Sequence, residues 1–138
     1  MKGKHLVILI APLAGVSVLV AHFWGGPWST MRCIGFGMIV FGFAMWSVAH
    51  VQLGASFSAT AQARKLVTHG IYSKIRNPIY VFGSCMIAGV ILVIGRPVYL
   101  LIFVVLIPMQ IQRAKKESAV LEAAFGEEYR KYRAGTWF

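Results

Sequence analysis

The sequence contains no aspartate, and its four glutamates are confined to residues 117–128, near the end of the chain. The long apolar runs that precede this window carry no carboxylate at all. A proton-coupled transporter needs an ionisable group near the middle of the bilayer. The distribution of acids therefore argues against a small four-helix efflux protein, which this chain matches in size.

Cysteine is also scarce, since Cys33 and Cys85 are the only two and both lie in apolar stretches. They form no CxxC spacing, and none of the four histidines has another His, Cys or acid three or four residues away. The sequence therefore predicts neither a disulfide framework nor a metal site. The glycine-rich strand-turn-helix fingerprint of soluble nucleotide-binding folds is missing too, because Gly35-Phe36-Gly37 lies in an apolar run and lacks a third glycine.

Hydrophobic residues make up 58% of the 138 residues and charged residues only 13%. Four apolar runs approach the ~20 residues that cross a bilayer as a helix: residues 6–23, 33–53, 79–95 and 97–111. The last two are short and joined by Arg96-Pro97, which predicts a hairpin whose ends extend into polar sequence. Lys2 and Lys4 precede the first run, which exceeds the ~7–15 apolar residues of a signal peptide, so we expect an uncleaved helix.

We therefore predict an all-α integral membrane protein with four transmembrane helices and a helical extension after the last one. We expect one membrane domain over residues 1–138, divided into an N-terminal helix pair (1–55) and a core (56–138). With four spans, twelve of the 14 Lys and Arg residues fall on one side, leaving only Arg32 and Arg96 opposite. The positive-inside rule then predicts that both termini and the central loop are cytoplasmic.

The net charge of +10 is explained by this topology and by anionic lipid headgroups. The alternation of basic and aromatic residues that is typical of nucleic-acid modules is absent, so we expect no nucleic-acid partner. Within the apolar runs, Gly35 and Gly42 stand two turns apart, a spacing that favours close helix contact.

The central segment, residues 66–80, reads as a structured loop. Gly70 favours a turn before Tyr72, and Asn77-Pro78 predicts a helix that starts with proline in its first turn. The exposed N–H groups of that turn, with Lys74 and Arg76 beside them, suit an anionic ligand group. A plain helix start with cations reaching toward the headgroups explains the same residues.

A second polar cluster follows the last apolar run. Arg113 and Glu117 are four residues apart and so share one helix face. Glu127 and Lys131 are predicted to form an exposed ion pair, and Gly126 is predicted to end or bend the helix before them.

These blocks resemble one superfamily. The chain reads Leu66-Val67-Thr68-x-Gly70-x-Tyr72, Arg76-Asn77-Pro78-x-Tyr80, Arg113-x-x-x-Glu117 and Phe125-Gly126-Glu127-Glu128-Tyr129. In order and spacing this is similar to the isoprenylcysteine carboxyl methyltransferase and phospholipid methyltransferase superfamily. Its members are small membrane enzymes that use S-adenosylmethionine. The resemblance covers residues 66–132, roughly half of the chain.

The resemblance implies a role for individual positions. It implies that the cofactor pocket is lined by Lys65, Leu66, Val67, Tyr72, Asn77, Pro78, Ile79, Tyr80 and Glu117. It also implies that Arg113 binds the methyl acceptor, with Arg113 and Glu117 as the catalytic pair. The prenylcysteine enzymes carry histidine where this chain has Asn77, and an acidic pair where it has Glu117-Ser118. The acceptor therefore stays open among an isoprenylcysteine carboxylate, a phospholipid amine and a small thiol.

The prediction is a membrane-embedded methyltransferase that acts on a lipid-soluble acceptor. We place it in a bacterial or archaeal cytoplasmic membrane, as a multi-pass protein whose active site faces the cytoplasm. Two other classes remain: a membrane reductase of related architecture that uses NADPH, and a non-catalytic helical interaction protein.

Overall fold

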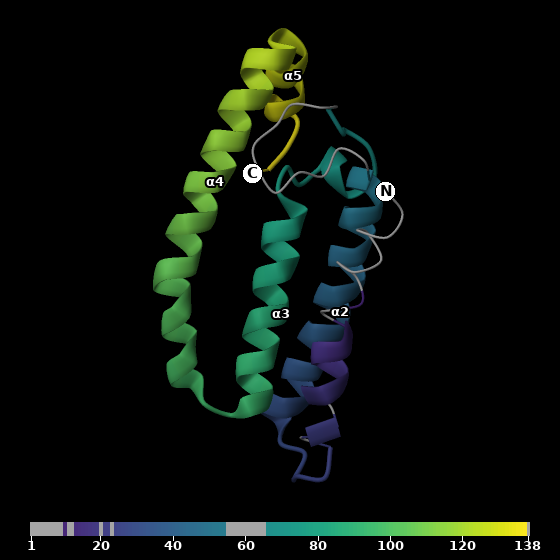
Figure 1. Ribbon diagram of the computed structural model, residues 1–138, viewed down its shortest axis with the longest axis vertical. Helices are drawn as coiled ribbons and strands as arrows, with labels where there is room; N and C mark the ends of the chain where they lie inside the picture. The colour runs from purple at the N-terminus through teal and green to yellow at the C-terminus, as the bar shows by residue number, and fades with distance from the viewer. Residues whose placement is uncertain (1–9, 11–12, 20, 23, 55–65, 138) are drawn as a thin grey trace.

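The computed structural model describes residues 10, 13–19, 21–22, 24–54 and 66–137 (Figure 1). Every regular element in these residues is helical, which confirms the all-α prediction. From residue 30 on, the described elements follow in the order α2 (Thr30–Leu53), η2 (Gly70–Ser73), α3 (Pro78–Ile94), η3 (Pro97–Ile102), α4 (Phe103–Phe125) and α5 (Glu127–Ala134), where η marks a 3-10 helix.

Among the described residues, two helical segments are long and apolar enough to cross a membrane, namely α2 and the continuous stretch Pro97–Phe125 formed by η3 and α4. Helix α3 has 17 residues. At about 1.5 Å per residue it is about 25 Å long, slightly less than a ~30 Å hydrocarbon core. The first predicted span, residues 6–23, lies partly outside the described residues.

Local sequence chemistry sets the helix ends. Ser29 caps α2 by accepting a hydrogen bond from the Arg32 N–H at 3.3 Å. As predicted, α3 starts at Pro78 directly after Asn77. Helix α4 ends at Phe125 because Gly126 adopts a φ of 51°, which turns the chain back into α5.

Helices α2 and α3 form the packed centre of the fold. Gly35 and Gly89 face each other so closely that a Cβ on Gly35 would lie 2.7 Å from the Gly89 carbonyl oxygen. Gly42, two turns further along α2, makes a similar contact with Met86 and the Phe82 carbonyl oxygen. The predicted role of Gly35 and Gly42 in close helix contact is therefore confirmed. Ile39 and Val93 fill the same interface and are fully buried.

Helix α3 lies between α2 and α4, and α5 turns back toward the loop that precedes α3 (Figure 1). Side-chain hydrogen bonds tie α4 to α3. The Ser84 hydroxyl donates to Gln110 Oε1 at 3.1 Å, and the Tyr80 hydroxyl donates to Glu117 Oε1 nearer the α5 end. The polar loop, the start of α3 and the end of α4 thus meet at one end of the helices.

Candidate functional site

The turn before Tyr72 is fastened to the end of α2. Gly70 has a φ of 63°, which allows the chain to pass tightly over the Gln52 side chain. Gln52 Oε1 accepts a hydrogen bond from the Ile71 N–H at 2.9 Å. This contact fixes η2 against the end of α2 and so positions Tyr72.

Tyr72 points inward and is 6% exposed, packed with Ala49 and Val67. Its hydroxyl is buried and has no hydrogen-bond partner among the described residues. Burial, together with the nearby Tyr132, Glu117 and Tyr80 groups, raises the pKa of Tyr72 above its usual value of 10. Tyr72 therefore stays protonated and offers a buried hydrogen-bond donor in need of an acceptor.

The two polar clusters of the sequence meet at Tyr80. Its hydroxyl donates a 2.5 Å hydrogen bond to Glu117 Oε1, across 37 positions of sequence. The Arg113 guanidinium lies over the Tyr80 ring, with its central carbon 5.8 Å from the ring centroid. Arg113 and Glu117 share a face of α4 as predicted, and the structure brings both of them to one aromatic side chain of α3.

The C-terminal helix closes the other side of the loop. The Tyr132 hydroxyl donates to the Tyr72 carbonyl at 2.7 Å, and the Trp137 N–H donates to the Lys74 carbonyl at 2.8 Å. Tyr129 is the anchor of α5, with only 1% of its surface exposed. The sequence assigned no role to Tyr132 or Trp137. Both donate to backbone carbonyls, which every residue type carries, so the residue types alone do not predict these bonds.

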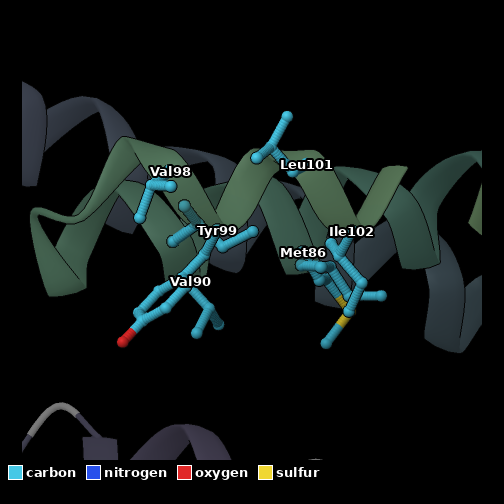
Figure 2. Close-up of a pocket in the computed structure, with 8 residues that line it drawn as sticks. Met86, Val90, Val98, Tyr99, Leu101 and Ile102 are labelled. Atoms are coloured by element: carbon cyan, nitrogen blue, oxygen red, sulfur yellow. The ribbon is translucent and has the colours of Figure 1, made fainter. Parts of the chain in front are cut away.

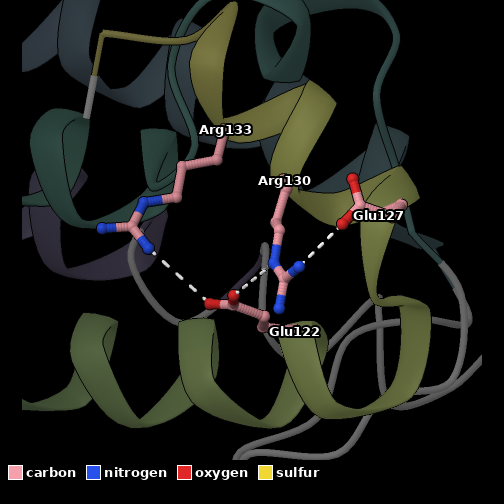
Figure 3. Close-up of polar contacts among 4 residues, drawn as sticks. All are labelled: Glu122, Glu127, Arg130 and Arg133. Carbon is pink, nitrogen blue, oxygen red and sulfur yellow. Dashed lines mark hydrogen bonds and ion pairs between the residues drawn. The ribbon is translucent and has the colours of Figure 1, made fainter.

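Four charged side chains hold α5 against α4 (Figure 3). Glu122 accepts a 2.9 Å hydrogen bond from Arg130 Nε and lies 3.7 Å from Arg133 Nη1. Arg130 also donates to Glu127 at 2.7 Å. The predicted pairing of Glu127 with Lys131 is wrong. Glu127 pairs instead with Arg130, which also binds Glu122 on α4.

The structure gathers most of the predicted site residues around this junction. Tyr72, Tyr80, Arg113 and Glu117 converge, while Val67 and Ile79 pack against Tyr72. Asn77 precedes the first turn of α3, and Pro78 is buried in that turn. Leu66 is half-buried at the start of the described loop, and Lys65 lies outside the described residues. Within the described part of the chain, no three His, Cys, Asp or Glu side chains gather as a metal site requires.

Tyr132 is expected to give the protein an alkaline limit of stability. Burial, with the neighbouring Tyr129, raises its pKa from 10 to about 12, against the opposing charge of Arg76. Above pH 10 the unfolded chain releases this proton while the folded chain keeps it, so the free energy of unfolding falls as pH rises from 10 toward 12. Tyr132→Phe should cost about 1 kcal/mol at pH 8 and make the alkaline decline shallower. Thermal unfolding in detergent from pH 8 to 11 measures both effects, and an unchanged slope in the variant would contradict the assignment.

Apolar helices of membrane length, with an aromatic and charged cluster at one end, are typical of a helical membrane protein. The sequence profile of the phospholipid methyltransferase family matches residues 28–128, and the chain belongs to this family. The match covers α2, the loop, α3 and α4. It confirms the methyltransferase family that the motifs predicted.

The chain is also similar to Protein-S-isoprenylcysteine O-methyltransferase of Schizosaccharomyces pombe. The two are 34% identical over an alignment of 137 positions, and this alignment covers 95% of this chain and 56% of the relative. The chain thus spans little more than half the length of that relative. The aligned part includes the loop, Arg113 and Glu117, but the profile of the family ends before Tyr132.

Proposed function

We propose that this chain is an S-adenosylmethionine-dependent methyltransferase whose acceptor is dissolved in the membrane. The observation that carries the proposal is the junction of Tyr80, Glu117 and Arg113 beside the unpartnered hydroxyl of Tyr72. One carboxylate, one guanidinium and two tyrosines meet there at the polar end of apolar helices.

The residues present fit the cofactor. S-adenosylmethionine carries an ammonium group, a carboxylate, ribose hydroxyls and a sulfonium cation. Glu117 can accept from the ammonium or from ribose hydroxyls, and the buried Tyr72 hydroxyl can donate to an acceptor atom. The ring of Tyr80 stabilises a nearby cation through its face. The loop 66–67 and residues 77–79 would complete the pocket mainly through backbone groups, with Lys65 at its edge.

The bound cofactor would supply an electrophilic methyl group, and its transfer is an in-line displacement that needs no metal. The chain's own residues would act by position and by exclusion of water. The Tyr80 hydrogen bond holds the Glu117 carboxylate in place, and α5 covers the loop through Tyr132. Arg113, on the face of α4 toward Tyr80, would orient the acceptor.

The acceptor would be an isoprenylcysteine-type carboxylate, a phospholipid amine or a small thiol. A guanidinium pairs readily with a carboxylate or a phosphate, so Arg113 suits the first two best. A carboxylate acceptor would need no base. An amine acceptor would release a proton, and solvent at the edge of the junction or Glu117 would accept it.

We further propose that four helices cross the membrane, with the first formed by residues 6–23 and with both termini and the junction on the cytoplasmic side. The twelve cations on that side support this orientation. In this arrangement residues 1–138 form one domain, in which the pair 1–55 supports the core 56–138. We propose the cytoplasmic membrane of a bacterium or archaeon as its location.

Calorimetry on the purified protein tests the cofactor. We expect S-adenosylhomocysteine and S-adenosylmethionine to bind in the micromolar range, about −8 kcal/mol, and NADPH not to bind. Labelled S-adenosylmethionine with a host lipid extract would then identify the methylated product. Preference for NADPH would instead support a reductase, and failure to bind either cofactor in detergent and in lipid would support a non-catalytic protein.

A further inference from the structure

Arg76, the last residue before the Asn77-Pro78 step, carries a buried donor to which the site described so far gives no role. Its Nε atom is buried and has no hydrogen-bond partner among the described residues. The residue as a whole is half-buried. A guanidinium nitrogen removed from water loses solvation and needs an acceptor in return. One donor of Arg76 is therefore left for a bound group to satisfy.

The glutamates of the chain do not supply this acceptor. Glu117 accepts from α3, and Glu122 and Glu127 bind cations of α5 (Figure 3). Glu128 is exposed at the start of α5. Within the described residues, which include all four glutamates, Arg76 takes part in no ion pair. A partly desolvated cation is stabilised by an anion, so we expect the partner of Arg76 to be an anion from outside the chain.

Tyr132 links Arg76 to the buried hydroxyl of Tyr72. The positive charge of Arg76 opposes the rise in the pKa of Tyr132, so these two side chains lie close together. The Tyr132 and Tyr72 hydroxyls also interact electrostatically, and Tyr132 donates to the Tyr72 carbonyl. Two buried donors, the Arg76 Nε and the Tyr72 hydroxyl, therefore lie around one side chain of α5, and neither has a partner in the described part of the chain.

The start of α3 favours a negative group at the same place. Asn77 makes no side-chain cap on α3, and the first turn of a helix carries a partial positive charge. The cofactor of the proposed function has one anionic group, the carboxylate of its amino-acid end. A carboxylate accepts several hydrogen bonds at once, and its bonds to a guanidinium are among the strong ones.

We propose that Arg76 and the Tyr72 hydroxyl hold the carboxylate of S-adenosylmethionine. The inference rests on the proposed function and adds Arg76 to its binding residues. It also orients the cofactor, because its ammonium group is on the same carbon as the carboxylate. That ammonium group falls to Glu117, whose charge acts on the Tyr72 hydroxyl.

Calorimetry with two ligands tests the contact to the carboxylate. The ligands are S-adenosylhomocysteine and its decarboxylated form, which keeps the adenosine, the thioether and the amine. We expect the wild type to bind S-adenosylhomocysteine about 10- to 100-fold more tightly, the effect of one hydrogen bond between charged groups. Arg76→Gln should lose this preference by weakening S-adenosylhomocysteine alone, and Arg76→Lys should retain part of it. Equal loss for both ligands would overturn the inference by showing a structural role.

Lys74→Gln is the matched control, because Lys74 lies two residues away, is exposed and carries the same charge. It should keep the wild-type preference. An unchanged preference in Arg76→Gln overturns the inference alone, whereas a wild type that binds neither ligand overturns the proposed function with it.

Phosphatidylglycerol added to the detergent-solubilised proteins tests the other source of an anion, a lipid phosphate. We expect it to change the melting temperatures of the wild type and of Arg76→Gln alike. If it raises that of the wild type only, and S-adenosylhomocysteine binds both proteins equally, Arg76 binds a lipid phosphate and the inference is overturned.

Discussion

Replacing Glu117 with glutamine is expected to weaken binding of S-adenosylhomocysteine about 10- to 100-fold, the effect of losing a hydrogen bond to a charged group worth roughly 1.5–3 kcal/mol. The amide keeps the shape of the side chain and still accepts from the Tyr80 hydroxyl, so the junction itself should survive. Only the negative charge is removed from a partly buried position that already holds Arg113 and two tyrosines. Calorimetry measures the loss directly, without an identified acceptor.

Glu128→Gln provides the control for this variant, because Glu128 is an exposed residue at the start of α5. It removes the same charge from the same end of the chain and should bind the ligand as the wild type does. If Glu117→Gln binds equally well, or if both variants lose binding alike, Glu117 does not hold the cofactor. Methyl transfer by Glu117→Ala, measured once an acceptor is known, should then fall at least as far as binding does.

Replacing Gly35 with valine is expected to destabilise the fold by about 3 kcal/mol, the upper part of the range for overpacked interiors. The atom that the new side chain meets is the Gly89 carbonyl oxygen, 2.7 Å from an ideal Cβ, and a backbone carbonyl in a helix cannot rotate away. The helices must separate, which also opens the contacts of Ile39 and Val93. In detergent the melting temperature should fall by roughly 10 °C.

Gly37→Val is the matched control, since Gly37 lies two residues away on the same helix and a Cβ there meets nothing within 4 Å. Its melting temperature should stay close to that of the wild type. Gly89→Val, the reciprocal change, should repeat the loss because its Cβ would lie 2.6 Å from the Gly35 carbonyl oxygen. Equal melting temperatures for the Gly35 and Gly37 variants would mean that α2 and α3 are not packed as the structure has them.

Local chemistry made several features predictable. Proline disfavours helix in the residue before it and suits the first turn, so the start of α3 at Pro78 follows from Asn77-Pro78 alone. Glycine tolerates positive φ, so Gly126 marks the end of α4. The family was readable as well, because four short blocks keep their order and spacing over half of the chain.

The contacts of the site were not predictable in the same way. Helical spacing placed Arg113 and Glu117 on one face, but it says nothing about which residue that face meets, and the partner proved to be Tyr80. Gln52 and Tyr132 act on backbone groups of the loop, and every residue type carries such groups. Glu127 pairs with Arg130, whose guanidinium also binds Glu122 on α4, and this contact between helices cannot be read from spacing within α5.

The sequence alone determined the class, a helical membrane protein of the methyltransferase family. The scarcity and placement of acids, the apolar runs and the motif blocks were sufficient, because each depends on composition or on neighbours in sequence. Only the tertiary structure decided that Glu117 accepts a hydrogen bond from Tyr80, that α5 covers the loop, and that an open apolar groove lies between α3 and η3 (Figure 2). These contacts join residues far apart in the chain, and their geometry depends on how closely the helices pack. Gly35 and Gly89 set that distance for α2 and α3, and Ser84 and Gln110 set it for α3 and α4.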